Sequence, residues 1–238
     1  MGLMWRLIVP VAVVCASCGQ PEAIRTAHEA EPAAASPAAE SPSSSSAPRI
    51  VFLGDSLTAG YGLAKDESVP ALIQKRLKDA GYPYEVVNAG VSGDTSAGGL
   101  NRLEWSLAGD VKVLVIELGA NDGLRGLPVA GLKQNLTEII TRAQARNIKV
   151  ILTGMEAPPN FGPAYTSEFR GVYRQLAKEH DVVFVRFYLD GVAGIPNLNI
   201  ADGIHPNAEG SRIVEKTIWA ALEPLLTKRT ADRKNPGR

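Results

Sequence analysis

One stretch decides the fold of this chain: Ile50-Val51-Phe52-Leu53-Gly54-Asp55-Ser56-Leu57-Thr58-Ala59-Gly60-Tyr61-Gly62. Its first four residues form an apolar run that ends at a glycine, a pattern typical of a buried strand. Ser56 would then lie at the carboxyl end of that strand, where ligands bind in open α/β sheets. A sharp turn there would present the serine hydroxyl to a base, so Ser56 is a candidate nucleophile. The alternative is that Asp55 or Ser56 only caps a helix.

The composition indicates one globular domain with additional segments. The chain has 238 residues, of which 45% are hydrophobic and 21% are charged, enough to bury a sizeable core. Lysine plus arginine and aspartate plus glutamate are equal, at 25 each. A nucleic-acid-binding protein usually has an excess of basic residues, so we expect no nucleic-acid partner. We also expect the chain to be a monomer.

Residues 1–18 are typical of an export signal. Arg6 is followed by the apolar stretch 7–14 and then by Cys15-Ala16-Ser17-Cys18. The apolar stretch is too short to span a bilayer as a helix. The small residues before Cys18 resemble a bacterial lipobox, in which the cysteine is lipidated. We therefore expect a membrane-anchored lipoprotein on the periplasmic side. The alternative is ordinary signal cleavage, which would leave a soluble periplasmic or secreted protein.

Residues 19–48 are rich in alanine, proline, serine and glutamate and contain almost no large apolar side chains. Such a segment cannot bury enough surface to offset the entropy of ordering, so we expect a disordered tether. The folded domain is expected at residues 49–226, and residues 227–238 are expected to form a polar tail.

Within that domain, apolar runs alternate with amphipathic segments. We predict strands at 50–53, 84–89, 111–118, 148–154 and 182–187, and helices at 69–80, 98–108, 129–146, 164–180 and 207–226. The continuous apolar runs indicate strands that are covered on both faces, as in parallel sheets. This alternation predicts a three-layer α/β/α fold with a five-stranded, doubly wound, flavodoxin-like parallel sheet.

Three further polar clusters would meet Ser56 at one edge of that sheet. They are Asn88-Ala89-Gly90-Val91-Ser92-Gly93-Asp94-Thr95 after the second strand, Gly119-Ala120-Asn121-Asp122-Gly123 after the third, and Ala201-Asp202-Gly203-Ile204-His205-Pro206-Asn207 before the last helix. The carboxyl ends of parallel strands lie at the same edge, and a short return loop can bring the third cluster there.

These residue types fit acyl transfer. His205 can accept the Ser56 proton and later pass it to the leaving group, while Asp202 fixes the imidazole tautomer. The backbone N–H groups of Ser56 and Gly93 and the side-chain amide of Asn121 can stabilise the oxyanion. We also place Asp55 among the candidate substrate-binding residues.

The four clusters resemble the conserved blocks of the SGNH, or GDSL, hydrolase superfamily, and the resemblance extends from about residue 50 to residue 226. Val91-Ser92-Gly93-Asp94-Thr95-Ser96 and the stretch from Leu118 to Gly126 are most similar to the bacterial arylesterase, acyl-CoA thioesterase and lysophospholipase subfamily. The resemblance implies an esterase of broad specificity that forms an acyl-enzyme and uses no metal or cofactor. It also implies that the loop 124–128 closes on acyl chains.

In that loop Leu124 and Leu127 could cover an acyl chain, and Arg125 could remain in solvent or contact a phosphate. The alternative is a surface loop with incidental apolar residues. We therefore expect a small-molecule or lipid ester as substrate.

Other functions remain open at this point. A carbohydrate O-deacetylase could use the same four blocks, because a fold does not choose a substrate. A non-catalytic anchored binding protein would lack a triad residue, and none is missing. A metal site is disfavoured, since only His180 and His205 lie in the domain and it has no cysteine cluster.

Overall fold

The structure is a computed structural model that describes residues 47–228. The expected export signal, nearly all of the tether and most of the polar tail lie outside these described residues. Between residues 47 and 228, no helix combines the length and the apolar character needed to cross a membrane.

The centre of the domain is a five-stranded parallel sheet, which confirms the predicted fold class. Its strands are β1 (Arg49–Gly54), β2 (Glu85–Gly90), β3 (Val111–Glu117), β4 (Lys149–Thr153) and β5 (Val183–Val185), in the order β2-β1-β3-β4-β5. Phe52 in β1 and Ile116 in β3 are completely buried. Both strands read as continuous apolar runs because helices cover both faces of the sheet.

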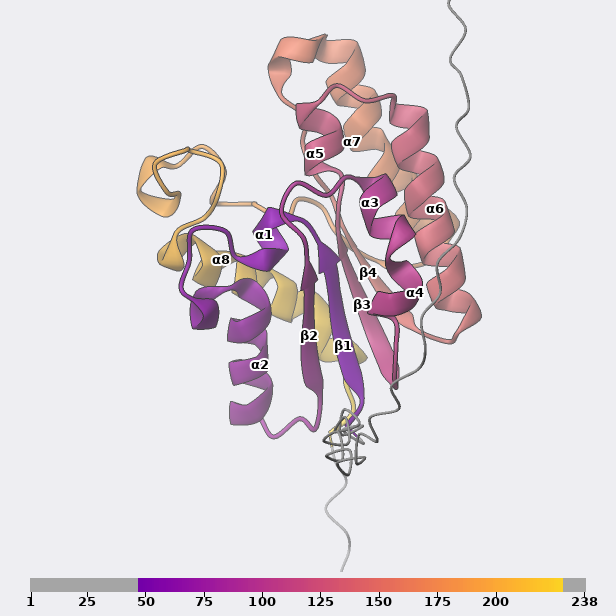
Figure 1. Cartoon of the computed structure of the whole chain (residues 1–238), viewed down its shortest axis with the longest axis vertical. Coiled ribbons are helices and arrows are strands. Elements are labelled where there is room, and N and C mark those ends of the chain that lie inside the picture. The colour runs from indigo at the N-terminus through magenta and orange to yellow at the C-terminus, as the bar shows by residue number, and fades with distance from the viewer. Residues whose placement is uncertain (1–46, 229–238) are drawn as a thin grey trace, which may run out of the picture. The chain divides into compact units, whose positions relative to one another are not determined.

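Helices and short 3-10 turns connect the strands. They are α1 (Ser56–Ala59), α2 (Val69–Asp79), α3 (Ser96–Asn101), α4 (Leu103–Ser106), α5 (Ala120–Leu124), α6 (Val129–Ala145), α7 (Gly162–Glu179) and α8 (Ala208–Leu222), with 3-10 turns η1 (Lys65–Glu67), η2 (Pro159–Phe161), η3 (Pro196–Leu198) and η4 (Glu223–Leu225). In Figure 1, α2 and α8 lie on one side of the sheet, while α3, α4, α6 and α7 lie on the other. Packing of α2 on α8, and of α3 and α7 on α6, completes the three layers.

The helix predicted at 98–108 is the main departure from the sequence pattern. The chain forms two short helices, α3 and α4, with a break at Arg102, whose φ of −105° and ψ of 9° are not helical. The side chain of Arg102 reaches back to the ends of β1 and β2. Tertiary hydrogen bonds therefore override the helical preference of this segment.

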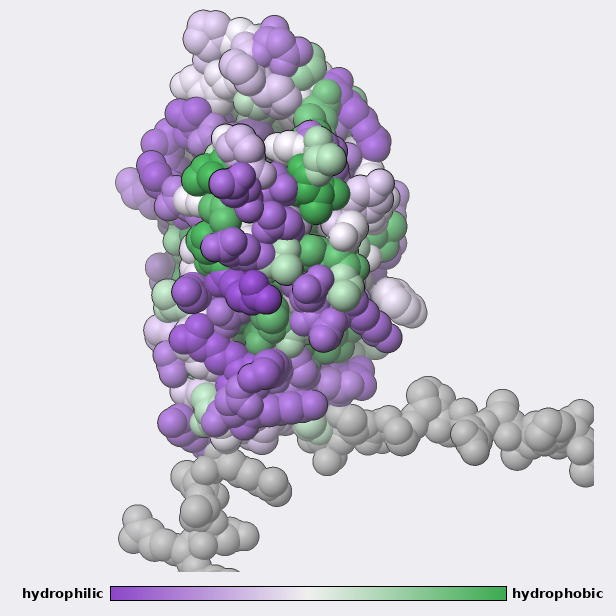
Figure 2. All heavy atoms as spheres, turned by 90° about the vertical axis from the view of Figure 1, so that its left-hand side faces the viewer, coloured by the Kyte–Doolittle hydropathy of each residue, from purple (hydrophilic) through white to green (hydrophobic). Residues whose placement is uncertain are grey.

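The loops at the carboxyl ends of the strands carry most of the exposed large apolar side chains. Among residues 47–228 these are Tyr61, Val91, Leu124, Leu127, Phe161, Ile195 and Ile204, and the one elsewhere is Trp105. Figure 2 shows a side face of the molecule on which hydrophobic residues occur in small patches among hydrophilic ones. The edge of the sheet that holds Ser56 is thus bordered by apolar loops.

Candidate active site

The structure brings Ser56, His205 and Asp202 into one hydrogen-bonded chain. Ser56 is the first residue of α1, and the other two lie in the loop before α8. The Oγ of Ser56 lies 2.8 Å from Nε2 of His205. The Nδ1 of the same ring lies 2.6 Å from Oδ2 of Asp202. A hydrogen on Nδ1 satisfies the carboxylate and leaves Nε2 free to accept the serine proton.

Asp202 is held as an ionised carboxylate. Its Oδ1 accepts hydrogen bonds from the backbone N–H groups of His205, at 3.0 Å, and Ile204, at 2.9 Å. These donors, together with the imidazole, lower the pKa of Asp202 to about 2. The carboxylate therefore stays charged and orients the imidazole at any pH above the acidic range. The ring of Tyr61 also packs against this imidazole, with 4.7 Å between the ring centres.

The turn that presents Ser56 is tightly packed. A side chain at Gly54 would overlap the hydroxyl of Thr58 and the carboxylate of Glu117. Asp55 caps α1, because its Oδ1 accepts from the backbone N–H of Leu57 at 3.0 Å. Capping by Asp55 and a nucleophilic role for Ser56 are therefore compatible. As the first helical residue, Ser56 has a backbone N–H with no partner inside the helix.

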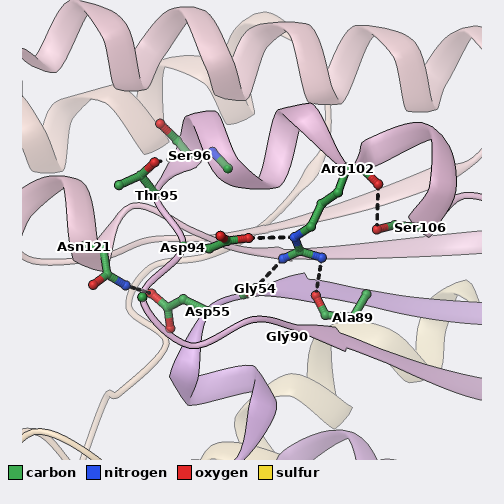
Figure 3. A network of polar contacts seen from close by, with 12 residues as sticks. Gly54, Asp55, Ala89, Gly90, Asp94, Thr95, Ser96, Arg102, Ser106 and Asn121 are labelled. Atoms are coloured by element: carbon green, nitrogen blue, oxygen red, sulfur yellow. Dashed lines mark hydrogen bonds and ion pairs between the residues drawn. The ribbon is translucent and has the colours of Figure 1, made fainter.

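Asp55 is not a substrate contact in this structure, which corrects our expectation. Its side chain is completely buried, and its Oδ2 accepts from Nδ2 of Asn121 at 3.0 Å. Figure 3 shows the two side chains pointing toward each other across the site. An amide nitrogen carries two hydrogens, so one remains for a substrate oxygen. The Asp55 carboxylate thus fixes the orientation of the Asn121 amide.

Sequence reasoning missed a second carboxylate beneath this turn, Glu117 at the end of β3. It is completely buried, and its Oε2 accepts from the backbone N–H groups of Asp55 and Thr58, both at 3.2 Å, and from the Thr58 hydroxyl at 2.8 Å. Burial raises the pKa of Asp55 to about 6. Burial and the charge of Asp55 raise the pKa of Glu117 well above its usual value. A glutamate that ends an apolar run gives no signal of this role in the sequence.

Gly93 lies in a loop that is fixed on both sides. Its φ of 84° is in the left-handed region, which favours glycine. Its carbonyl accepts from Nη2 of Arg125 at 2.8 Å. The next residue, Asp94, forms an ion pair of 2.6 Å with Nε of Arg102. These contacts set the direction of the Gly93 peptide.

Arg102 is a second residue that sequence reasoning missed. Beyond Asp94, its guanidinium donates to the carbonyls of Ala89, at 2.6 Å, and Gly54, at 2.8 Å (Figure 3). It therefore ties the ends of β1 and β2 to the loop that carries Gly93. An arginine inside an amphipathic segment looks like a solvent-exposed helix residue, so no sequence signal distinguishes it.

An apolar cavity of about 380 Å³ opens beside the triad. Leu57, Ala120 and Ile204, which are the chain neighbours of Ser56, Asn121 and His205, line it together with Leu124, Met155, Glu156, Ala157, Pro158, Pro159, Phe187, Leu189, Ala193, Gly194 and Gly203. We call it the apolar cavity. Its size is within the range that is usual for small-molecule sites.

The loop 124–128 contributes less to this cavity than we expected. Leu124 lines it, but Arg125 and Leu127 do not. Arg125 donates to the carbonyl of Gly93, and the carbonyl of Leu127 accepts from the Tyr165 hydroxyl at 2.9 Å.

Within the described part of the chain, no group of three or more histidine, cysteine, aspartate or glutamate side chains is arranged to hold a metal ion.

Comparisons with known proteins agree with this geometry. Residues 52–213 match the model of the GDSL-like lipase/acylhydrolase family. The chain is 46% identical over 181 residues to the esterase TesA of Pseudomonas aeruginosa, a match that covers 76% of this chain and 90% of the relative. It is 36% identical over 181 residues to the thioesterase 1/protease 1/lysophospholipase L1 of Escherichia coli strain K12, covering 76% of this chain and 86% of that protein.

A crystal structure of TesA matches with a TM-score of 0.71 and 46% identity, and covers 75% of this chain and 99% of that one. The sequence motifs, the five-stranded sheet and the relatives all agree. The chain therefore belongs to the GDSL-like lipase/acylhydrolase family, and it is an ester hydrolase.

Proposed function

We propose that this ester hydrolase works through an acyl-enzyme on Ser56, with His205 as general base and acid and Asp202 as the residue that orients the imidazole. The observation that supports this proposal is the continuous chain of short contacts, 2.8 Å from Ser56 to His205 and 2.6 Å from His205 to Asp202. This is the arrangement of nucleophile, base and orienting group that covalent acyl transfer requires.

In the first half of the reaction, Oγ of Ser56 attacks the ester carbonyl carbon while its proton moves to Nε2 of His205. The carbonyl oxygen becomes an oxyanion, for which the backbone N–H groups of Ser56 and Gly93 and the free amide hydrogen of Asn121 are the proposed donors. When the tetrahedral intermediate collapses, the C–O bond to the alcohol breaks. The imidazolium then protonates the departing oxygen, which leaves the acyl group on Ser56.

In the second half, His205 takes a proton from a water molecule, and the oxygen of that water attacks the carbonyl carbon of the acyl group on Ser56. The second intermediate collapses with return of that proton to Oγ of Ser56, and a carboxylic acid leaves. The charge on Asp202 stabilises the imidazolium in both halves, because its lowered pKa keeps it ionised.

The apolar cavity supports a lipid-type or aryl ester as substrate. Leu57, Ala120 and Ile204 place its opening beside the reacting groups, and Leu124 extends its apolar wall. Each methylene buried there should add about 0.8 kcal/mol to binding until the cavity is full. The names of the two relatives above include esterase, thioesterase and lysophospholipase. We therefore propose carboxylic esters as the main substrates, with thioesters as a second class.

The surroundings of the domain are also proposals. The pattern of residues 1–18 supports an exported protein, and Cys18 supports a lipid anchor on the periplasmic side. A tether at 19–48 would then carry a hydrolase domain at 49–226, followed by a short tail and acting as a monomer. The anchor is tested by growth with radiolabelled palmitate: the label should be incorporated into the wild-type protein and should be missing from Cys18→Ser.

The Ser56→Ala variant tests the nucleophile. The change removes one oxygen and leaves the packing of the turn intact, so kcat for 4-nitrophenyl butyrate should fall by at least about 10⁴-fold. Ser167→Ala, at an exposed position of α7, is the matched control and should retain wild-type kcat. Retention of a tenth of wild-type kcat by Ser56→Ala, with an unchanged melting temperature, would refute the assignment.

A further inference from the structure

A second cavity lies next to the apolar cavity and has no part in the reaction described above. Its volume is about 150 Å³, and its lining consists of Glu156, Arg170, Arg174, Phe184, Arg186 and Phe187. We call it the basic cavity. Glu156 and Phe187 line the apolar cavity as well, so the two cavities share a wall.

The basic cavity keeps unneutralised positive charge. Arg170 is neutralised by Glu156, since its Nη2 lies 2.6 Å from Oε2. Arg186 approaches Asp190 only to 3.9 Å, with both side chains largely exposed, a pair that contributes little. Arg174 makes no ion pair and no side-chain hydrogen bond with any residue between 47 and 228. Three arginines and one glutamate therefore leave an excess of positive charge in a small cavity.

These arginines suit the recognition of an anion. Arg170 and Arg174 lie four residues apart on α7, so their side chains project from one face of that helix. Arg186 reaches the cavity from the segment that follows β5. A guanidinium presents several N–H groups in a planar fork, which matches the oxygens of a carboxylate or phosphate. The volume admits such a group and little more.

The position of the basic cavity relates it to the substrate. Leu57, Ala120 and Ile204 connect the apolar cavity to the reacting groups, whereas Glu156 and Phe187 connect it to the basic cavity. A ligand that fills the apolar cavity from the ester carbonyl onward thus approaches the arginines with its far end. A long neutral chain would gain nothing from these charges, but a chain that ends in an anion would.

We propose that the basic cavity is an anion-binding subsite for amphiphilic substrates that carry a carboxylate or phosphate one apolar segment away from the scissile ester. This inference rests on the proposed function, because it places the reacting carbonyl at Ser56. The anion can belong to the acyl side, as in a hemiester of a dicarboxylic acid, or to the alcohol side, as in an ester of a hydroxyalkyl phosphate with a long alkyl chain. The chemistry of recognition is the same for both sources.

The test compares anionic and neutral esters of equal length. On the acyl side, kcat/KM is measured for the 4-nitrophenyl hemiester of suberic acid and for 4-nitrophenyl octanoate. On the alcohol side, the butyrate ester of 8-hydroxyoctyl phosphate is compared with octyl butyrate. In Arg174→Gln/Arg186→Gln the anionic-to-neutral ratio should fall at least about tenfold, because charge-assisted hydrogen bonds are lost.

Two further variants sharpen this test. Glu156→Gln frees Arg170 from its ion pair, so the ratio should rise instead of fall. Lys78→Gln removes an exposed positive charge on α2, and the ratio should stay unchanged. A drop in one arm alone identifies the side of the ester that carries the anion. An unchanged ratio in both arms, or an equal loss on anionic and neutral esters, would overturn the subsite.

Separate measurements test the anion-binding subsite and the proposed function. If the wild type does not hydrolyse the neutral esters, the proposed function is wrong. Binding of octyl phosphate, measured by calorimetry, then still tests the subsite. Wild-type protein should bind it at least about tenfold more tightly than Arg174→Gln/Arg186→Gln. Equal binding by the two proteins would overturn the inference.

Discussion

The turn that presents Ser56 and the loop that presents His205 meet in one site but are stabilised in different ways. The serine turn lies on the central strands, and three side chains bind it by hydrogen bonds: Glu117 at the end of β3, Asn121 in α5 and Arg102 between α3 and α4. The loop 194–205 crosses the surface, and most of its residues are exposed. The serine turn is thus part of the core, whereas the loop that carries His205 lies on the surface of the core.

The exposed loop is held mainly by its own backbone. The N–H of Ile200 donates to the carbonyl of His205 at 2.8 Å, and Asn199 pairs with Pro206 in an isolated bridge. The amide of Asn199 also donates to the carbonyls of Val192 and Ile195, both at 2.8 Å. These bonds close the loop locally and involve few core residues. A change in this loop should therefore affect catalysis more than stability, and a change under the serine turn should affect both.

Among the changes that distinguish the two regions, Asp202→Asn should have the largest effect, and it should leave stability nearly unchanged. An asparagine keeps the shape of the side chain, but it cannot hold the imidazole in the required tautomer or stabilise its charge. We expect kcat to fall by about 10³- to 10⁴-fold, with a shift in the free energy of unfolding below about 1 kcal/mol. Steady-state kinetics and urea unfolding on the same preparation give both quantities.

If Asp202→Asn unfolded at a much lower urea concentration than wild type, the exposed loop would contribute to the stability of the core, and the contrast between the two regions would be wrong. Asp66→Asn is a control, an exposed aspartate in η1 outside both cavities. It should change neither kcat nor the midpoint of unfolding.

The same contrast explains what the sequence could predict. Ser56, His205 and Asp202 are found from residue type and order, because acyl transfer needs those groups and parallel strands deliver them to one edge. The number of strands and their succession along the chain follow from the apolar runs, although β5 covers only Val183–Val185 of the predicted 182–187. Glu117 and Arg102 could not be found in this way. The role of Glu117 depends on contacts between β3 and α1, and the role of Arg102 depends on contacts with the ends of β1 and β2; only the folded chain creates these contacts.

Asp55 and the loop 124–128 were predicted to bind substrate because they are close in sequence to Ser56 and Asn121. Proximity to the nucleophile in the sequence suggested that Asp55 contacts substrate, but its side chain points into the core. Arg125 and Leu127 are close to Asn121 in the chain, yet they contact Gly93 and Tyr165 instead of lining the apolar cavity. Sequence distance does not indicate the direction of a side chain, and direction decides which residues meet a ligand.

Arg102→Met should have the next largest effect, this time on stability. The change removes the guanidinium that pairs with the Asp94 carboxylate and donates to the carbonyls of Gly54 and Ala89 in a largely buried place. Removal of one partner from such a network costs about 3 to 5 kcal/mol of unfolding free energy. We also expect a lower kcat, because the loop with Gly93 loses its anchor.

Arg142→Met provides the control, since that arginine pairs with Glu138 on the surface of α6. It should cost less than about 1 kcal/mol. If the two variants were equally stable, the serine turn would not depend on the network shown in Figure 3. Urea unfolding monitored by far-ultraviolet circular dichroism measures both variants under the same conditions.

Asp55→Asn should give the smallest of these effects, a change in how stability depends on pH. Burial raises the pKa of Asp55 from 3.8 to about 6, so the folded state binds its proton more tightly than the unfolded state does. The stability from this group is therefore complete below about pH 4 and is lost as the pH rises through about 6. The loss amounts to at most about 3 kcal/mol, since one pKa unit corresponds to about 1.36 kcal/mol.

Asp55→Asn cannot ionise, so the difference in unfolding free energy between variant and wild type should move in favour of the variant from pH 4 to pH 6. Ser167→Ala, at an exposed position of α7, changes no ionisable group and should show no such drift relative to wild type. The drift is expected because burial disfavours the charged form of the Asp55 carboxylate. A constant difference across this range would mean that Asp55 is ionised as easily as a surface aspartate. The serine turn would then not have the buried, electrostatically strained character that sets it apart from the exposed loop with His205.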